Sequence, residues 1–386
     1  MTLSLKTFLI IALLLTGAAR AADPITIGFL SQAVDLPPAL SNIDELPQDE
    51  GLAGARLAIA DNNTTGRFTG QEFDLAERLL GIGDDTGAAL AEMIDQGIQF
   101  FVLDLDQHAL DRVLKILGDK PVLLFNSRAE DRRFRAGDCH PSLLHTALSR
   151  DMRTDAMGQY LAYKRWREWL LIPGPRPEDA LFAGAVQRSA KKFGLKIVEK
   201  RQWTGEHDAR RTAQAEVPLF TQGVDYDVLV VADEIGDFGD YLEFRTWLPR
   251  PVAGTQGLIP RAWGRPVEQW GAAQLQERFL DHAGRWMLPR DYAAWVAVRS
   301  VGEGATRAKS LDFAPISNYI RSDKFSIAIF KGRKASYRSW NGQLRQPVPI
   351  MTARSIVSQA PLEGFLHPVT ELDTLGIDEP ENLCDF

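Results

Sequence analysis

Acidic side chains lie where several apolar runs of the sequence end. In an open α/β sheet, the loops at the carboxyl ends of the parallel strands bind the ligand. Several carboxylate oxygens that converge from such loops suit a hard cation such as Ca²⁺ or a lanthanide. The same acids could instead cap helices or lie solvated in loops, and the sequence leaves both interpretations open. The acids that could bind a ligand in this way are Asp35, Asp104, Asp106, Asp233 and Glu234.

An arginine cluster follows the apolar run 121–125. It could receive the carboxylates of an organic acid or of a quinone cofactor, because a guanidinium offers a carboxylate two parallel N–H groups. Glu130 and Asp131 lie within the cluster, so the alternative is a set of surface charges that pair with one another. Asn126 and Ser127 come directly after the run and are further candidates for ligand contacts. The arginines of the cluster are Arg128, Arg132, Arg133 and Arg135.

No catalytic signature accompanies these charges. The sequence contains no G-x-S-x-G, H-E-x-x-H or P-loop motif, and its six histidines show no metal-type spacing. The stretch 81–87 resembles a dinucleotide loop, but its third glycine comes one residue late and two carboxylates in its middle would repel a pyrophosphate. Trp263 is the tryptophan best placed to stack on a ligand, although most tryptophans are expected in the core. We therefore predict a binding protein rather than an enzyme, with no resident cofactor.

Strand and helix patterns alternate along the chain and would bring these residues to the edges of two sheets. A long irregular connection over 247–270 separates them from a helix over 291–308 and two or three strands between 325 and 350. The alternation predicts an α/β protein with two doubly wound, Rossmann-like lobes and a ligand cleft between them. The first set of expected strands is 24–30, 71–80, 98–105 and 121–125, with helices over 51–63, 87–96 and 109–117. The second set is 168–172, 196–203 and 227–232, with helices over 154–167, 178–193 and about 208–221.

The N-terminus is expected to be a secretion signal over residues 1–21. It has Lys6, an apolar run over 8–15 and small residues at 19 and 21, as in an A-x-A cleavage site. The apolar run is less than half of the about 20 residues that a membrane span needs. The formal charge of −7 becomes about −9 once Lys6 and Arg20 are removed, which disfavours nucleic acid as a partner.

The two cysteines, Cys139 and Cys384, are compatible with an exported protein. In an oxidising compartment we expect them to form a disulfide that holds the C-terminal tail, and the alternative is two free thiols.

Four strings of the sequence together resemble the type I periplasmic substrate-binding proteins of branched-chain amino acid ABC transporters. They are ITIGFL at 25–30, GLAGARLAIADNNTTGRFTGQEFDL at 51–75, AEMIDQGIQFFVLDL at 91–105 and RSAKKFGLKIVEK at 188–200. Other strings are similar to a subgroup found beside pyrroloquinoline-quinone-dependent alcohol dehydrogenases. These are the tryptophan-rich 164–169, the loop 249–258, the segment 338–347, and 364–367 with 372–376.

The resemblance implies a monomeric periplasmic receptor whose two lobes close around a small ligand and deliver it to an inner-membrane permease and ATPase. It implies an N-terminal lobe over 24–146 and about 280–325, a C-terminal lobe over 147–279 and about 326–360, and a tail over 361–386. Amino-acid binders of this family hold their zwitterion with small polar loops, but the corresponding positions here read DLDQ at 104–107 and NSRAED at 126–131. These positions favour a Ca²⁺ or lanthanide cation as a candidate ligand over the amino acids that the parent family binds. The alternatives are the quinone cofactor, an organic acid or an alcohol-derived ligand, or a role as accessory partner of a quinoprotein dehydrogenase.

Overall fold

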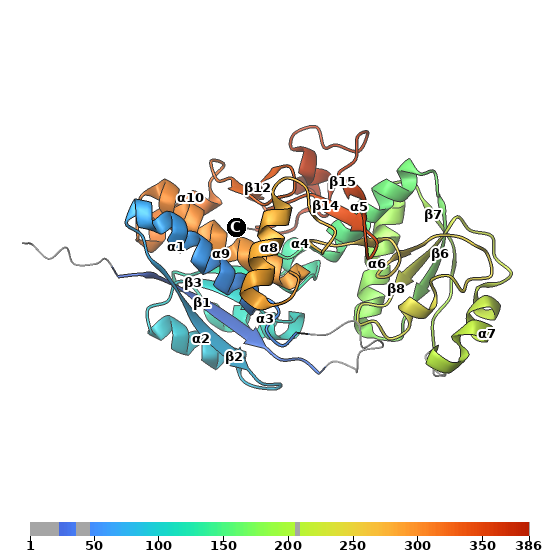
Figure 1. Ribbon diagram of the computed structural model, residues 1–386, viewed down its shortest axis with the longest axis horizontal. Helices are drawn as coiled ribbons and strands as arrows, with labels where there is room; N and C mark the ends of the chain where they lie inside the picture. The colour runs from blue at the N-terminus through green and yellow to red at the C-terminus, as the bar shows by residue number, and fades with distance from the viewer. Residues whose placement is uncertain (1–22, 36–46, 205–208, 386) are drawn as a thin grey trace, which may run out of the picture.

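The computed structural model describes residues 23–35, 47–204 and 209–385, which form two α/β lobes side by side along the long axis of the molecule (Figure 1). The secretion signal predicted over 1–21 lies outside these residues. Within the described ranges, no helix has the length and apolar character that crossing a membrane would require.

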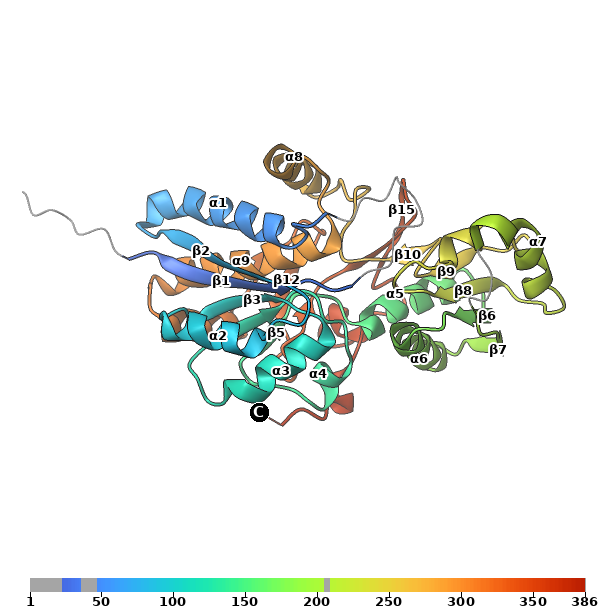
Figure 2. The same ribbon diagram turned by 90° about the horizontal axis from the view of Figure 1, so that it is seen from below.

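The first lobe is built on a five-stranded parallel sheet with the order β2-β1-β3-β4-β5. Helices α1, α8 and α9 cover one face and α2 and α3 cover the other, as Figure 2 shows. The strands are β1 (Ile25–Gln32), β2 (Phe73–Leu80), β3 (Phe100–Asp104), β4 (Leu123–Asn126) and β5 (Leu143–His145). The helices are α1 (Leu52–Thr69), α2 (Thr86–Asp95), α3 (Gln107–Leu117), α4 (Arg133–Ala136), α8 (Ala272–Ala283), α9 (Pro289–Ala308) and α10 (Phe313–Arg321).

Local sequence explains why these elements begin and end where they do. Strand β3 is buried along its whole length, as the uninterrupted apolar run of a central parallel strand requires. Asp85 caps α2 by accepting N–H groups from Gly87 and Ala88 at 2.9 and 3.1 Å. Gly54 lets α1 approach α9 so closely that any side chain at this position would overlap the Asp291 carbonyl. These features fix the carboxyl ends of the strands, where the predicted site residues lie.

The second lobe has a four-stranded parallel sheet with the order β7-β6-β8-β9. Helices α5 and α6 pack on one face and α7 on the other. The strands are β6 (Glu168–Pro173), β7 (Lys196–Lys200), β8 (Val228–Ala232) and β9 (Val252–Gly254), and the helices are α5 (Arg150–Tyr163), α6 (Pro177–Lys192) and α7 (Ala209–Thr221).

Two small antiparallel sheets complete the molecule. One joins β10 (Ile259–Pro260), β14 (Val348–Met351) and β15 (Ile356–Ala360), and it lies against α5 between the lobes. The other joins β11 (Ile327–Ala328), β12 (Lys334–Tyr337) and β13 (Leu344–Arg345). The chain thus passes between the lobes three times, after β5, after β10 and after β13.

Two segments lie in a different lobe from the one the sequence predicted. Helix α8 packs on α1 and buries Leu275 and Phe279 in the core of the first lobe, whereas residues up to 279 were expected in the second. Strands β11 to β13 also belong to the first lobe, because β11 packs on α9 and Tyr337 joins the same core. In the sequence, the apolar residues of α8 come directly after a stretch rich in turn residues, which makes the helical pattern hard to recognise.

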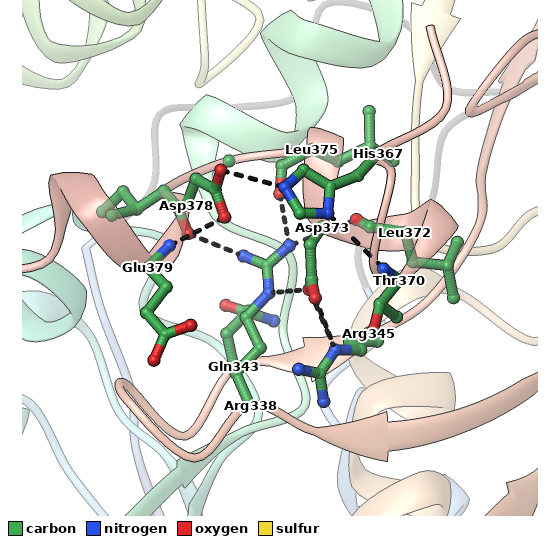
Figure 3. A network of polar contacts seen from close by, with 12 residues as sticks. Arg338, Gln343, Arg345, His367, Thr370, Leu372, Asp373, Leu375, Asp378 and Glu379 are labelled. Carbon is green, nitrogen blue, oxygen red and sulfur yellow. Dashed lines mark hydrogen bonds and ion pairs between the residues drawn. The ribbon is translucent and has the colours of Figure 1, made fainter.

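The C-terminal tail, 361–385, contains the short 3₁₀ turns η2 (Glu371–Thr374) and η3 (Glu379–Glu381) and is held by a buried arginine (Figure 3). Arg338 is 2% exposed and donates to Asp373 at 2.8 Å. It also donates to three tail carbonyls, those of Leu372, Leu375 and Ile377, at 3.2, 2.8 and 3.1 Å. At the end of the tail, the predicted disulfide between Cys139 and Cys384 is present, with Cα atoms 5.4 Å apart.

Candidate functional site

A cavity of about 620 Å³ lies between the two lobes. Its walls come from the loops after β1, β2 and β4 and the start of α3 in the first lobe, and from α5, the start of α6 and the loop after β8 in the second. A smaller cavity of about 130 Å³ shares Arg128, Glu130 and Arg153 with it. The carboxyl ends of strands from both lobes thus meet at one site, as expected for a ligand cleft.

The strand-end acids do not converge on a metal. Among residues 23–35, 47–204 and 209–385, no group of three or more His, Cys, Asp or Glu side chains is arranged to hold an ion. Asp104, only 1% exposed, binds both nitrogens of the Arg290 fork, with Nε to Oδ1 at 2.9 Å. Arg290 also reaches Glu50 at 3.3 Å, and burial raises the pKa of Glu50. The prediction that Asp104 takes part in a cation site is therefore wrong, because a guanidinium from α9 already occupies its oxygens.

The carboxylates of Asp106 and Asp233 accept hydrogen bonds from backbone N–H groups. The Asp106 carboxylate accepts the Ala109 N–H at 2.7 Å and caps α3. Asp233, also 1% exposed, accepts four backbone N–H groups of the loop after β8, from residues 236 to 239, at 2.6 to 3.0 Å. A carboxylate with four such donors needs no cation. The Asp233 carboxylate binds the backbone of its loop in place of the predicted ligand contact. Asp106 caps α3 and also lines the larger cavity.

Glu234 lies at the centre of an ion-pair ladder that connects the lobes. From the first turn of α5, Arg150 binds Asp131 at 2.7 Å and Glu234 at 2.5 and 2.8 Å. Three residues further along the same turn, Arg153 binds Glu130 at 2.6 Å and Glu234 at 3.3 Å. Burial raises the pKa of Glu234, and the Arg150 guanidinium opposes that rise. We call these five side chains the α5 ladder.

Of the two polar residues at the end of β4, Ser127 lines the smaller cavity and Asn126, the last residue of the strand, shapes the loop that follows. Asn126 is fully buried; its Oδ1 accepts the Ala129 N–H at 2.8 Å, and its Nδ2 lies 3.0 Å from Nδ1 of His145. The Ser127 hydroxyl donates to the Leu103 carbonyl at 3.1 Å.

Trp263 is not at the site. It is fully buried in the first-lobe core, stacked on Tyr292 with ring centres 4.4 Å apart, and lines neither cavity. The prediction of a stacking contact with ligand is wrong for this residue because the irregular segment folds inward here. Asp35 does line the larger cavity and is exposed.

Two arginines of the cluster, Arg132 and Arg133, pair with carboxylates, whereas Arg128 and Arg135 have none within 4.0 Å among the described residues. Arg132 pairs with Asp151 at 2.9 Å and Arg133 pairs with Asp111 at 3.3 Å. Both acids lie outside the cluster, and Glu130 and Asp131, the partners that the surface-charge alternative expected, bind Arg153 and Arg150 instead. Arg135 is 1% exposed and donates to Gln343 at 2.5 Å and to neighbouring carbonyls.

Arg128 differs from its neighbours. It lines both cavities and donates to the Gln32 carbonyl at 3.2 Å. No carboxylate in the part of the chain that the structure describes lies within 4.0 Å of it. Burial lowers its pKa, an effect that the more distant Asp104 opposes. A half-buried guanidinium remains charged, so Arg128 still requires an anion as its partner.

Arg112 supplies a second guanidinium beside it. Arg112 lines the larger cavity and donates to the Gln32 side chain at 3.0 Å. Gln32 is 7% exposed and is held by the carbonyls of Gly81 and Asp84, to which it donates at 3.2 and 2.8 Å. One fixed glutamine therefore positions two arginines at the cleft, and each lacks a carboxylate partner among the described residues.

Sequence reasoning missed Arg112, Arg150, Arg153 and Arg290. For the two α5 arginines a signal existed. Ser149 accepts the Met152 N–H at 3.1 Å and caps α5, so the helix begins at Arg150 and not at Thr154 as predicted. Reading Ser149 as the cap would have placed both arginines in the first turn, next to the first crossing between the lobes.

No family model and no curated protein matches the chain. Solved structures do. A substrate-binding protein of an ABC transporter from Sphaerobacter thermophilus has a TM-score of 0.70 at 14% identity, covering 92% of this chain and 100% of that one. A periplasmic binding protein from Burkholderia mallei has a TM-score of 0.66 at 16% identity, covering 94% and 98%.

A third solved structure was determined with a ligand. It is a solute-binding protein of an ABC transporter from Rhodopseudomonas palustris BisB5, in complex with 3,4-dihydroxybenzoic acid, with a TM-score of 0.61 at 11% identity, covering 88% and 95%. At these identities the likeness shows the fold. The predicted fold class, two α/β lobes in the arrangement of type I periplasmic binding proteins, is confirmed.

Proposed function

We propose that the chain is the periplasmic solute-binding component of an ABC transporter and that it captures a small organic carboxylate between its lobes. It has no chemistry of its own in this role, and an inner-membrane permease and ATPase would receive the ligand. The observation that carries the proposal is Arg128, a half-buried guanidinium that lines both cavities with no carboxylate partner among the described residues.

The chemistry of the cleft favours a carboxylate over a neutral ligand. A carboxylate can accept two N–H groups from one guanidinium, and a second guanidinium at Arg112 adds to the attraction. Apolar lining from Ala147, Leu148 and Pro289 in the smaller cavity would cover a hydrocarbon body. The larger cavity, about 620 Å³, falls within the range of small-molecule sites, about 300 to 1,000 Å³.

The ligand of the Rhodopseudomonas palustris protein supports the same class. 3,4-Dihydroxybenzoic acid is a small carboxylate, and the protein that binds it shares this fold. Pyrroloquinoline quinone, which the sequence resemblance to the quinoprotein-associated subgroup favours, is also a carboxylate and belongs among the candidates. A Ca²⁺ or lanthanide ion is the weaker candidate, because Asp104, Asp233 and Glu234 already have partners.

A thermal-shift screen of the purified protein tests the proposal. The panel contains aromatic and aliphatic monocarboxylates, 3,4-dihydroxybenzoate, pyrroloquinoline quinone, Ca²⁺, La³⁺ and leucine. A ligand at 100 times its Kd should add about 2.7 kcal/mol to the free energy of unfolding. We expect a carboxylate to raise the melting temperature and Arg128→Met to abolish the shift.

Arg188→Gln is the matched control. Arg188 pairs with Asp151 on the α6 surface and lines neither cavity, so this variant should respond as the wild type does. A shift with La³⁺ or Ca²⁺ and none with any carboxylate would mean that the proposal is wrong. So would a carboxylate response that Arg128→Met leaves intact.

A further inference from the structure

The α5 ladder determines which electric charges a ligand meets on the walls of the cleft. Glu130 and Asp131 come from the first lobe and Glu234 from the second, and all three line the larger cavity. Each carboxylate binds a guanidinium from the first turn of α5 at 3.3 Å or less. Arg150 and Arg153 are also well enclosed, with side chains 10% and 14% exposed.

An α-amino acid needs two kinds of partner. Its carboxylate needs cationic or N–H donors, and its ammonium needs acceptors, of which a buried carboxylate is the strongest. In this cleft, arginines bind both oxygens of Glu234 and one oxygen each of Glu130 and Asp131. An ammonium that approached Glu130 or Glu234 would lose its hydration and face the positive charge of Arg153 at the same time.

The remaining acids of the larger cavity do not replace this partner. Asp35 is exposed to solvent, and Asp106 already accepts the N–H that caps α3. Glu178 is half-buried in the first turn of α6, where the helix N-terminus stabilises its charge. The smaller cavity contains one acid, Glu130, which Arg153 binds.

We infer that Arg150 and Arg153 determine specificity, and that the cleft selects carboxylates without an α-ammonium group over the corresponding amino acids. The inference rests on the proposed function, since it names the class of carboxylate. Arg153 is the more decisive of the two, because it lines both cavities and is the partner of Glu130.

The structure predicts a gain of function when this guanidinium is removed. Arg153→Gln leaves Glu130 without its partner, while Arg150 still binds Asp131 and Glu234. The uncovered carboxylate would then accept an ammonium. The double variant Glu130→Gln with Arg153→Gln takes that carboxylate away again and is the matched control.

The test uses pairs of ligands that differ only in the α-amino group. These are 4-methylpentanoate and leucine, 3-methylbutanoate and valine, and 3-phenylpropanoate and phenylalanine, titrated calorimetrically into each variant. We expect the wild type to bind no amino acid as tightly as its matched acid. We expect Arg153→Gln to bind at least one amino acid about tenfold more tightly than the wild type does, and the double variant to lose that gain.

The outcomes separate the inference from the proposed function. Amino-acid binding by the wild type that matches or exceeds acid binding overturns the inference, and so does an Arg153→Gln variant with no gained amino-acid affinity. A wild type that binds none of the acids, together with a gain in Arg153→Gln, supports the role of Arg153 in excluding amino acids and counts against the proposed function. If Arg153→Gln does not fold, as judged by circular dichroism, Arg150→Gln makes the same test, because it uncovers Asp131.

Discussion

Replacing Arg338 by methionine is the most direct test of how the C-terminal tail is held. The change keeps much of the side-chain volume and removes every donor. It leaves the buried carbonyls of Leu375 and Ile377 without their donor, and it leaves the Leu372 carbonyl with only the Leu375 N–H at 3.3 Å. Asp373 keeps Arg345, which binds it at 2.9 and 3.1 Å (Figure 3).

The expected loss follows from the burial of these groups. Breaking one side of a buried ion pair costs about 3 to 5 kcal/mol, and a buried carbonyl that loses its partner costs about 1 to 3 kcal/mol. The two effects are not additive here, because a tail that detaches lets its carbonyls reach water. We therefore expect Arg338→Met to lower the free energy of unfolding by about 3 to 5 kcal/mol.

Urea unfolding measures the loss, and hydrogen exchange locates it. The amides of 372–377 should lose protection before those of α9 do. Arg78→Gln is the control: Arg78 pairs with Glu92 at 2.9 Å with side chains 47% and 59% exposed, so its removal should cost no more than about 0.5 kcal/mol. A loss below about 1 kcal/mol for Arg338→Met would show that the buried network does not hold the tail.

Three further predictions concern the fold and its pH dependence. Gly54→Ala should destabilise the protein by about 1 to 3 kcal/mol, because the new methyl group overlaps a carbonyl of α9. Gly184→Ala, where the nearest atom is a side-chain nitrogen at 3.5 Å, should stabilise the protein by about 0.5 to 1 kcal/mol. The midpoints of urea unfolding compare the two variants. Burial, with Arg135 nearby, lowers the pKa of His145 well below 6.5, so only the unfolded chain takes up this proton as the pH falls. Stability should then decrease below pH 6.5 by up to about 1.4 kcal/mol per pH unit, and His145→Gln should flatten that part of a pH series of unfolding curves. Reduction of the disulfide, which closes a loop across 245 residues, should lower the free energy of unfolding by up to about 5 kcal/mol in calorimetry with and without reductant; an unchanged transition would contradict its role as a tail anchor.

The fold was predictable from the sequence because its signals are local. Strand β3 is an apolar run between a helix stop and a helix cap, and α2 starts at the Asp85 cap. Helix α8 was missed because its pattern follows a stretch rich in proline and glycine, and its partner α1 lies about 200 residues earlier in the chain. The boundaries between lobes depend on such distant contacts, which no short window of sequence contains.

The site was harder to predict because its chemistry depends on pairing. Asp104 is bound by Arg290, 186 residues later in the chain, and Arg150 binds Glu234 across 84 residues. In sequence, a carboxylate at the end of a strand looks the same whether it is free for a cation or held by an arginine. The sequence therefore indicated where charges gather, but it could not distinguish a cation site from a set of ion pairs that leaves two arginines of the cleft without a carboxylate.

Under the proposed function, the same pairing would let one helix influence both selectivity and closure. The α5 ladder crosses the cleft, with Asp131 on one lobe and Glu234 on the other bound by the same Arg150 side chain. Part of the free energy that holds the lobes together then comes from the protein itself. A ligand shifts the balance between open and closed lobes only by its preference for the closed form. Since Arg128 and Arg112 are the cleft guanidiniums without a carboxylate among the described residues, a carboxylate bound there adds a contact that the α5 ladder does not already make. Selectivity would then reside in the arginines that are already paired, and affinity in the two that are not.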